Sequence, residues 1–155
     1  MSLALGVWLG SILFFGAAVA PAAFTVLPST HDAGMLVGAS LRRLHVMGLV
    51  AGVVYLAGSL IAARVLKGSM EWASLRNLLV VAMMGLTLLL NAVIIPRMDR
   101  LRQAVEAQSG DIVNVPPTDP RRAAFDRLHI VSTRLESGVL VIGLGVLYLT
   151  VSMAG

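Results

Sequence analysis

The chain of 155 residues contains no cysteine and few charged residues. The absence of cysteine excludes disulfides, zinc–thiolate sites, iron–sulfur clusters and cysteine nucleophiles. Charged residues make up 13% of the chain, whereas soluble domains carry about 25%. Hydrophobic residues make up 57%, and the mean hydropathy is +0.87. A surface of this composition suits lipid better than water, which indicates a membrane protein.

The sequence motifs of common enzyme classes are also missing. The chain has no HExxH pair, no Walker loop, no GxSxG elbow and no GxGxxG fingerprint, so nothing specific favours an enzyme. A net charge of +4 is compatible with nucleic-acid binding. However, the basic residues flank hydrophobic segments, and no basic patch with interleaved aromatic residues occurs. We therefore expect membrane lipids, and no nucleic acid, as partners.

Four long apolar segments occupy nearly the whole chain, and each is long enough to cross a hydrocarbon core of about 30 Å. The expected spans are about 3–27, 44–66, 74–97 and 132–153, with a polar connection at about 109–119. We predict an all-α fold, in which a single transmembrane domain, 1–155, forms an up-down-up-down four-helix bundle. Mixed polar sequence next to the last three spans predicts that helices 2, 3 and 4 extend beyond the membrane on one side.

Prolines and capping residues predict where these helices begin, bend and end. A proline inside a helix removes one backbone hydrogen bond and bends or ends the helix. A polar residue that accepts a hydrogen bond from the first turn marks a helix start, and so does proline at the first helical position. The signals are Pro21 and Pro96 for bends, Pro28 for an end, and Ser29 with Asp32 and Asp119-Pro120 for starts.

Lysine and arginine are unevenly divided between the two ends of the predicted bundle. With four spans, both termini and the connection between helices 2 and 3 share one side, where three of these residues lie. The other nine lie on the side of the two remaining connections. The positive-inside rule then places those connections in the cytoplasm and both termini outside. We expect a multi-pass protein of a bacterial inner membrane.

Polar side chains inside the spans indicate a site. His129, Ser132 and Glu136 follow helical spacing and share one face of the fourth helix. Ionisable groups inside membrane helices are costly and usually face the bundle interior or a water-filled cavity. We therefore predict that polar residues of helices 2, 3 and 4 converge in one layer near a membrane face. Its members are the candidate metal ligands His45 and His129 and the candidate ligand-binding residues Asn91, Arg97, Ser132 and Glu136.

Each of these residues also has a simpler structural explanation. Arginine near a helix end can extend to lipid headgroups, and a membrane carboxylate can pair with an arginine on a neighbouring helix. For Glu136 the expected partner is Arg97, because its planar fork holds a carboxylate bidentately. Asn91 and Ser132 can form interhelical hydrogen bonds that only hold the fold. The sequence leaves both interpretations open.

Several short segments resemble a known family. They are 20–24, with Pro21; 44–48, with His45; 91–97, from Asn91 to Arg97; and 119–132, with Phe125, His129 and Ser132. In this order, and covering nearly the whole chain, they resemble the transmembrane protein 205-like family of four-helix membrane proteins. The resemblance implies the fold and the positions Asn91, Pro96, Arg97, His129 and Ser132, and it implies no particular activity.

Two functions follow from the predicted layer. The first is a binding protein that holds a transition metal ion or haem b between His45 and His129, because neutral imidazole is a good ligand for both. The alternative is a transporter or channel-like protein in which the same layer receives a small solute or ion. A structural or assembly role remains a further possibility. Small residues spaced by four could support a homo-oligomer, through Gly34, Gly38, Gly48 and Gly52.

Overall fold

The protein is helical in the part of the chain that the structure describes. The computed structural model describes residues 1–67, 73–109 and 112–152, and these ranges contain helices and no strand, which confirms the all-α class. Residues 110–111 of the predicted polar connection and residue 153 of the last predicted span lie outside them. The elements are α1 (Ser2–Phe14), a π-helical turn (Phe15–Val19), α2 (Ala20–Val26), α3 (Thr30–Lys67), α4 (Leu75–Leu89), a second π-helical turn (Leu90–Ile94), α5 (Ile95–Ser109), a 3₁₀ turn (Ile112–Asn114) and α6 (Pro120–Ser152).

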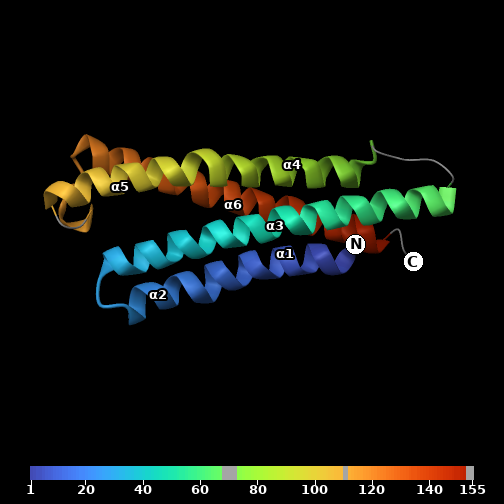
Figure 1. Ribbon diagram of the computed structural model, residues 1–155, viewed down its shortest axis with the longest axis horizontal. Helices are drawn as coiled ribbons and strands as arrows, with labels where there is room; N and C mark the ends of the chain where they lie inside the picture. Colours follow the sequence, from blue (N-terminus) through green and yellow to red (C-terminus); the bar gives the residue numbers. More distant parts are fainter. Residues whose placement is uncertain (68–72, 110–111, 153–155) are drawn as a thin grey trace.

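Four helical stretches in the described residues are long and apolar enough to cross a membrane. They are Ser2–Val26, Thr30–Val65, Leu75–Ala107 and Pro120–Ser152. The connection between α2 and α3 and the connection between α5 and α6 lie at one end of the molecule, and the start of α1 and the end of α6 lie at the other (Figure 1). The chain is thus a multi-pass integral membrane protein, and a four-helix bundle as expected.

The predicted bends occur as π-helical turns. Each turn ends two residues before a proline, Val19 before Pro21 and Ile94 before Pro96. Proline has no N–H to donate and its ring crowds the preceding turn, and a π turn is one of the ways in which a helix absorbs such a disturbance. Pro28 ends the first helix as expected, because Leu27 before it is extended, with φ −79° and ψ 144°.

The two predicted helix starts are confirmed. Ser29 Oγ accepts a hydrogen bond from the backbone N–H of Asp32 at 3.0 Å and donates one to Asp32 Oδ2 at 2.6 Å. At the start of α6, Asp119 Oδ1 accepts from the backbone N–H of Arg121 at 2.7 Å, and Pro120 is the first helical residue. Both arrangements satisfy N–H groups that the first turn of a helix leaves without an internal partner.

The half of the bundle toward the chain termini is a closely packed apolar core. Gly48 on α3 lies against Trp8, and Gly143 on α6 lies against Leu9, so closely that a Cβ atom at either glycine would overlap its neighbour. Small residues at such points let membrane helices approach each other. The buried residues of this core are Leu5, Trp8, Leu9, Tyr55, Val80, Met83, Val139 and Val146.

The glycines expected to mediate oligomer formation face the interior of the helix bundle. A Cβ at Gly52 would lie 2.8 Å from Met84 Sδ, and Gly48 is in contact with Trp8. Gly34 lies against the Arg102 side chain, and Gly38 lines a cavity. The Gly48 and Gly52 face is therefore already covered within one chain and is no surface for a second copy. Formation of an oligomer stays a prediction.

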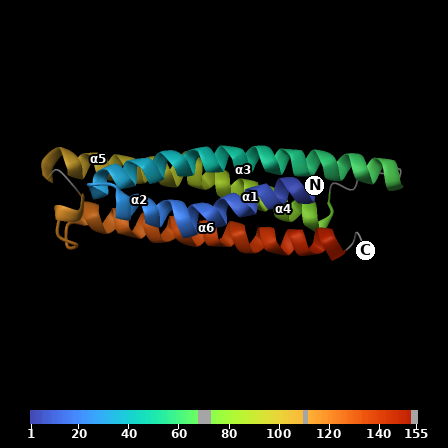
Figure 2. The same cartoon turned by 90° about the horizontal axis from the view of Figure 1, so that it is seen from below.

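The half of the bundle toward the α2–α3 and α5–α6 connections divides into two pairs of helices. α2 packs on α3, and α5 packs on α6, and the two pairs diverge toward the connections (Figure 1). The view turned by 90° shows α5 on the side of α3 and α6 on the side of α2 (Figure 2). The candidate site lies between the two pairs.

The packing changes the depth expected for α3. The sequence predicts that this helix enters the membrane near Leu44, with the preceding residues outside. In the structure, only Leu27–Ser29 separates α2 from α3, so the first part of α3 lies beside α2. Because Gly48 is opposite Trp8 and the two helices are antiparallel, His45, three residues before Gly48, is level with residue 11, three residues after Trp8 and near the middle of the first helix. This residue thus lies deeper than a membrane face if the first helix spans the bilayer.

Candidate functional site

A cavity of about 930 Å³ fills the space between the diverging helix pairs. The first helix forms an apolar wall that contains Ile12, Phe15, Ala17, Pro21 and Phe24. Polar groups come from the first half of α3, from α5 and from the first half of α6. This volume lies in the range of ligand pockets, about 300–1,000 Å³. The cavity therefore joins an apolar surface to a polar one within a membrane protein.

The deep end of the cavity is formed by a side-chain contact between His45 and Glu136, which is an ion pair when the histidine is protonated. His45 Nε2 contacts Glu136 Oε1, and His45 is 1% exposed. Glu136 lines the cavity, and His45 reaches it through this carboxylate. The second ring nitrogen of His45, Nδ1, is buried and has no hydrogen-bond partner within the described ranges. The pair ties α3 to α6 at the boundary between the cavity and the apolar core.

Two ion pairs connect α3 with α5 along one side of the cavity. His31 Nδ1 lies 2.7 Å from Glu106 Oε1, and Arg42 contacts Asp99. The long side chains bridge helices whose backbones have diverged. The opposite side, between α2 and α6, has no ion pair among the described residues, and the wall of α2 there is apolar.

Arg102, Phe125 and His129 form a row on the polar side of the cavity. The guanidinium carbon of Arg102 lies 5.4 Å from the centroid of the Phe125 ring, which is the geometry of a cation–π contact. The ring of His129 is nearly parallel to Phe125, at 5°, with centroids 6.5 Å apart. On its other side, Arg102 reaches Gly34, where a Cβ atom would lie 3.2 Å from the guanidinium carbon. The absence of a side chain at Gly34 thus leaves room for the guanidinium.

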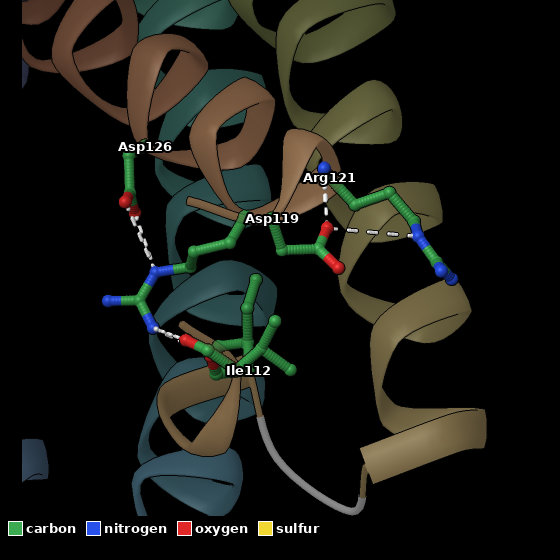
Figure 3. Close-up of polar contacts among 6 residues, drawn as sticks. Ile112, Asp119, Arg121 and Asp126 are labelled. Carbon is green, nitrogen blue, oxygen red and sulfur yellow. Dashed lines mark hydrogen bonds and ion pairs between the residues drawn. The ribbon is translucent and has the colours of Figure 1, made fainter. Parts of the chain in front are cut away.

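The connection before α6 is held against this end of the cavity. Arg122 Nε donates to both carboxylate oxygens of Asp126, at 3.2 and 3.1 Å, and its Nη1 donates to the carbonyl oxygen of Ile112 at 2.6 Å. Figure 3 shows Ile112 and Asp126 on one side of the start of α6 and Arg121 on the other, beside Asp119. Arg122 is therefore committed to structural contacts.

The structure brings together four of the six predicted site residues. His129, Ser132 and Glu136 line the cavity, and His45 contacts Glu136. Asn91 and Arg97 are not among the lining residues. The predicted pairing of Arg97 with Glu136 is wrong, because Arg97 is exposed and the carboxylate contacts His45 instead. The sequence placed α3 too shallow in the membrane. The greater depth of α3 explains why His45, and not Arg97, is the partner of Glu136.

The two-histidine ligand set stays a prediction. His45 uses Nε2 for Glu136, and His129 stacks on Phe125. Glu136 follows His129 by seven residues, which corresponds to about 10 Å along a helix. Within the described residues, no group of three or more histidine, aspartate or glutamate side chains could hold a metal ion. The arrangement does not form a ready metal centre.

Sequence reasoning missed the row of Arg102 and Phe125 and the pair of His31 and Glu106. These residues belong to segments that the sequence places outside the membrane, where charged residues need no special explanation. One signal was available, since Arg102 and Glu106 are four residues apart in a helix that also carries apolar residues at helical spacing. The partner helix of that face was not predictable without the fold.

No curated protein and no solved structure matches the chain. One family model matches residues 3–107, from the first helix into α5. The match includes the apolar wall of the cavity, His31, His45 and Arg102, and it ends before α6 with Glu136 and His129. On this match the chain belongs to the family described as a domain of unknown function, DUF4149.

Proposed function

We propose that the protein binds a small solute in the cavity between the two helix pairs and serves its passage into or across the membrane. The observation that carries this proposal is the cavity of about 930 Å³, which runs from the connections to the His45 and Glu136 pair. Because that pair is level with the middle of the first helix, a solute in the cavity would lie well inside the bilayer. We place the protein in a bacterial inner membrane, with the connections in the cytoplasm.

Features of the helices around the cavity support a transport role over a purely structural one. Ionisable residues within membrane spans are rare and mark substrate or ion pathways, and here His31, Asp99, Arg102, Glu106 and Glu136 line one cavity. Transporters also build their sites beside interrupted helices. The π-helical turn Phe15–Val19 contributes to the apolar wall. A bundle that only held its fold would gain more from a filled core.

Binding of a transition metal or haem b is the second candidate. In its favour, His129 lines the cavity and His45 Nδ1 has no partner among the described residues. Against it, both imidazoles already have neighbours that fix them, Glu136 and Phe125. A visible absorption spectrum and metal analysis of the purified protein test it. A haem band or a bound metal that is lost on substitution of either histidine would make it the better proposal.

The absence of cysteine allows a direct test of the cavity. Single cysteines at Gly38 and Ser137 lie in the cavity wall, and a cysteine at Gly85 is the matched control, because Gly85 is exposed on α4 within a membrane span. A Cβ at Gly38 or Gly85 meets nothing within 4 Å, so neither change disturbs packing. The protein is studied in open membrane fragments, in which both membrane faces are accessible, with a charged thiosulfonate that does not enter lipid.

We expect the thiols at Gly38 and Ser137 to react, because the cavity admits water, and the thiol at Gly85 to stay unreactive in lipid. Size-exclusion profiles of the three variants confirm that each is folded. If neither cavity position reacts, or if all three react equally, the cavity is not a water-accessible solute site and the proposal fails.

A further inference from the structure

We infer that the ligand of this cavity is an anionic amphiphile with a single acyl chain, a long-chain carboxylic acid, whose carboxylate binds Arg102 and whose chain lies along the first helix. The inference rests on the proposed function and specifies its substrate class. It depends on three observations: the division of the cavity into an apolar and a polar wall, the arrangement of Arg102, and the different closure of the two sides of the cavity.

The first observation is that the apolar wall carries no ionisable residue. From Ser2 to Leu27 the chain contains no charged residue, and the wall is built from apolar side chains such as Ile12, Phe15, Pro21 and Phe24. A small hydrophilic ion would leave this wall facing water. An acyl chain would cover it and gain about 0.8 kcal/mol for each CH₂ group buried from water. The cavity therefore fits a ligand with a long apolar part.

The second observation is that Arg102 differs from the other charged residues of the cavity. Three carboxylates of the polar wall, on Asp99, Glu106 and Asp126, contact Arg42, His31 and Arg122, and the fourth, on Glu136, contacts His45. For Arg102 no described residue lies within ion-pair distance or accepts a hydrogen bond, and its contacts are the ring of Phe125 and the backbone at Gly34.

A guanidinium has five N–H donors arranged in a fork that matches a carboxylate. The contacts of Arg102 with Phe125 and Gly34 hold the fork in place without using these donors on a described acceptor. His129 lies beside Phe125 in the same row. The fork of Arg102 thus matches one acidic headgroup.

The third observation concerns the route to the site. The side between α3 and α5 is crossed by the ion pairs of Arg42 with Asp99 and His31 with Glu106. The side between α2 and α6 is bordered on α2 by the exposed Phe24. An acyl chain can therefore approach from the lipid between α2 and α6, whereas the headgroup reaches Arg102 near the end of the first helix. One chain suits a cavity of about 930 Å³.

Binding of tritiated palmitate to the full chain in detergent tests the inference. We expect saturable binding that unlabelled palmitate displaces. Hexadecanol lacks the charge and acetate lacks the chain, so neither should displace it. Arg102→Leu should weaken binding at least about tenfold, because it removes charge-assisted hydrogen bonds, and Arg102→Lys should restore part of it. Arg97→Leu is the matched control, because Arg97 is an exposed arginine of the same helix outside the cavity.

The cavity volume is tested independently of the charge. Gly38→Leu adds a side chain at the cavity wall and should weaken binding, whereas Gly85→Leu places the same side chain in open space on the outer face and should leave binding unchanged. In the unmodified protein, a palmitate analogue with a photoreactive diazirine in the chain should label residues 12–24. Labelling confined to the outer face of α4 would overturn the inference, even if every variant failed to fold.

Three other outcomes of the binding experiment also bear on the inference. Equal displacement by hexadecanol, equal effects of Arg97→Leu and Arg102→Leu, or no saturable binding would each overturn the inference. These failures differ from failure of the proposed function. Reactive cysteines at Gly38 and Ser137 without palmitate binding would keep a solute site and exclude this ligand class, whereas unreactive cysteines there would remove the solute site itself.

Discussion

At the scale of single residues, the contact between His45 and Glu136 should be the most sensitive to substitution, because it joins two helices at a buried point. His45 is 1% exposed, and its contact with Glu136 connects α3 to α6. Replacing His45 with leucine leaves the carboxylate without its partner. We expect the free energy of unfolding in detergent to fall by about 3 kcal/mol, the lower end for a broken buried pair, because Glu136 keeps some contact with the cavity.

The double variant His45→Leu and Glu136→Leu separates a broken pair from simple loss of packing. We expect it to recover much of the loss, because no charge is then left buried. Arg97→Leu is the control and should change stability by no more than about 0.5 kcal/mol, as is usual for exposed positions. Strictly additive losses for His45 and Glu136 would mean that the two side chains do not stabilise each other.

Gly48 gives a second prediction at this scale. A methyl group there would overlap the indole ring of Trp8, whereas a methyl group at Gly85 meets nothing within 4 Å. Gly48→Ala should destabilise the protein by about 1–3 kcal/mol, the usual range for overpacking. Gly85→Ala should be neutral or stabilising by up to about 1 kcal/mol, because alanine is the better helix former. Thermal unfolding of both variants measures the difference, and equal melting temperatures would contradict the close approach of α1 and α3.

The site residues show which contacts could be predicted from the sequence. Helical spacing correctly brought His129, Ser132 and Glu136 to one face, because that spacing is set within one helix. The partner of Glu136 was wrong, because it depends on how far α3 slides along its neighbours. A three-residue connection and a contact between Gly48 and Trp8 decide that shift, and neither can be read from a single helix.

At the scale of helices, boundaries were the most predictable feature, since caps and prolines act within a few residues. Ser29, Pro28 and Asp119 behave as expected. The form of the bends was not predicted, because proline is compatible with a kink, a break or a π turn. The divergence of the helix pairs was not predicted either, since the contacts between the pairs join residues far apart in the sequence, such as Gly34 and Arg102.

The cap of α6 can be tested at this scale. Asp119→Ala removes the acceptor of the Arg121 backbone N–H and should cost about 1 kcal/mol, the typical value for a lost cap. The effect should be local. Amide hydrogen exchange should therefore rise in the first turn of α6 and stay unchanged around Val139 in the core. Thr118→Ala, a change at the exposed neighbouring residue, is the control, and equal exchange in both variants would show that Asp119 is no cap.

At the scale of the whole molecule, the structure divides into a closed half and an open half. The apolar core near the termini gives the bundle its stability, and the diverging helices near the connections form the cavity. Basic residues are concentrated at the open half, where nine of the twelve lysines and arginines lie. Two of them have structural contacts, since Arg42 joins α3 to α5 and Arg122 holds the connection before α6. The same residues therefore bear both on the fold and on its orientation.

Orientation is the last prediction. The positive-inside rule counts lysine and arginine near the ends of spans, whether or not they are paired, so the open half should face the cytoplasm. Alkaline phosphatase fused after the last residue should be active in a bacterial host, and a fluorescent protein fused there should be dark. The reverse should hold for reporters inserted at Asn114, an exposed residue of the connection before α6. The two sites also test whether α6 crosses the membrane, because α6 is the only span between Asn114 and the fusion after the last residue. Reporters that agree at both sites would contradict four spans, and a complete reversal would place the cavity on the outer side and require its ligand to come from there.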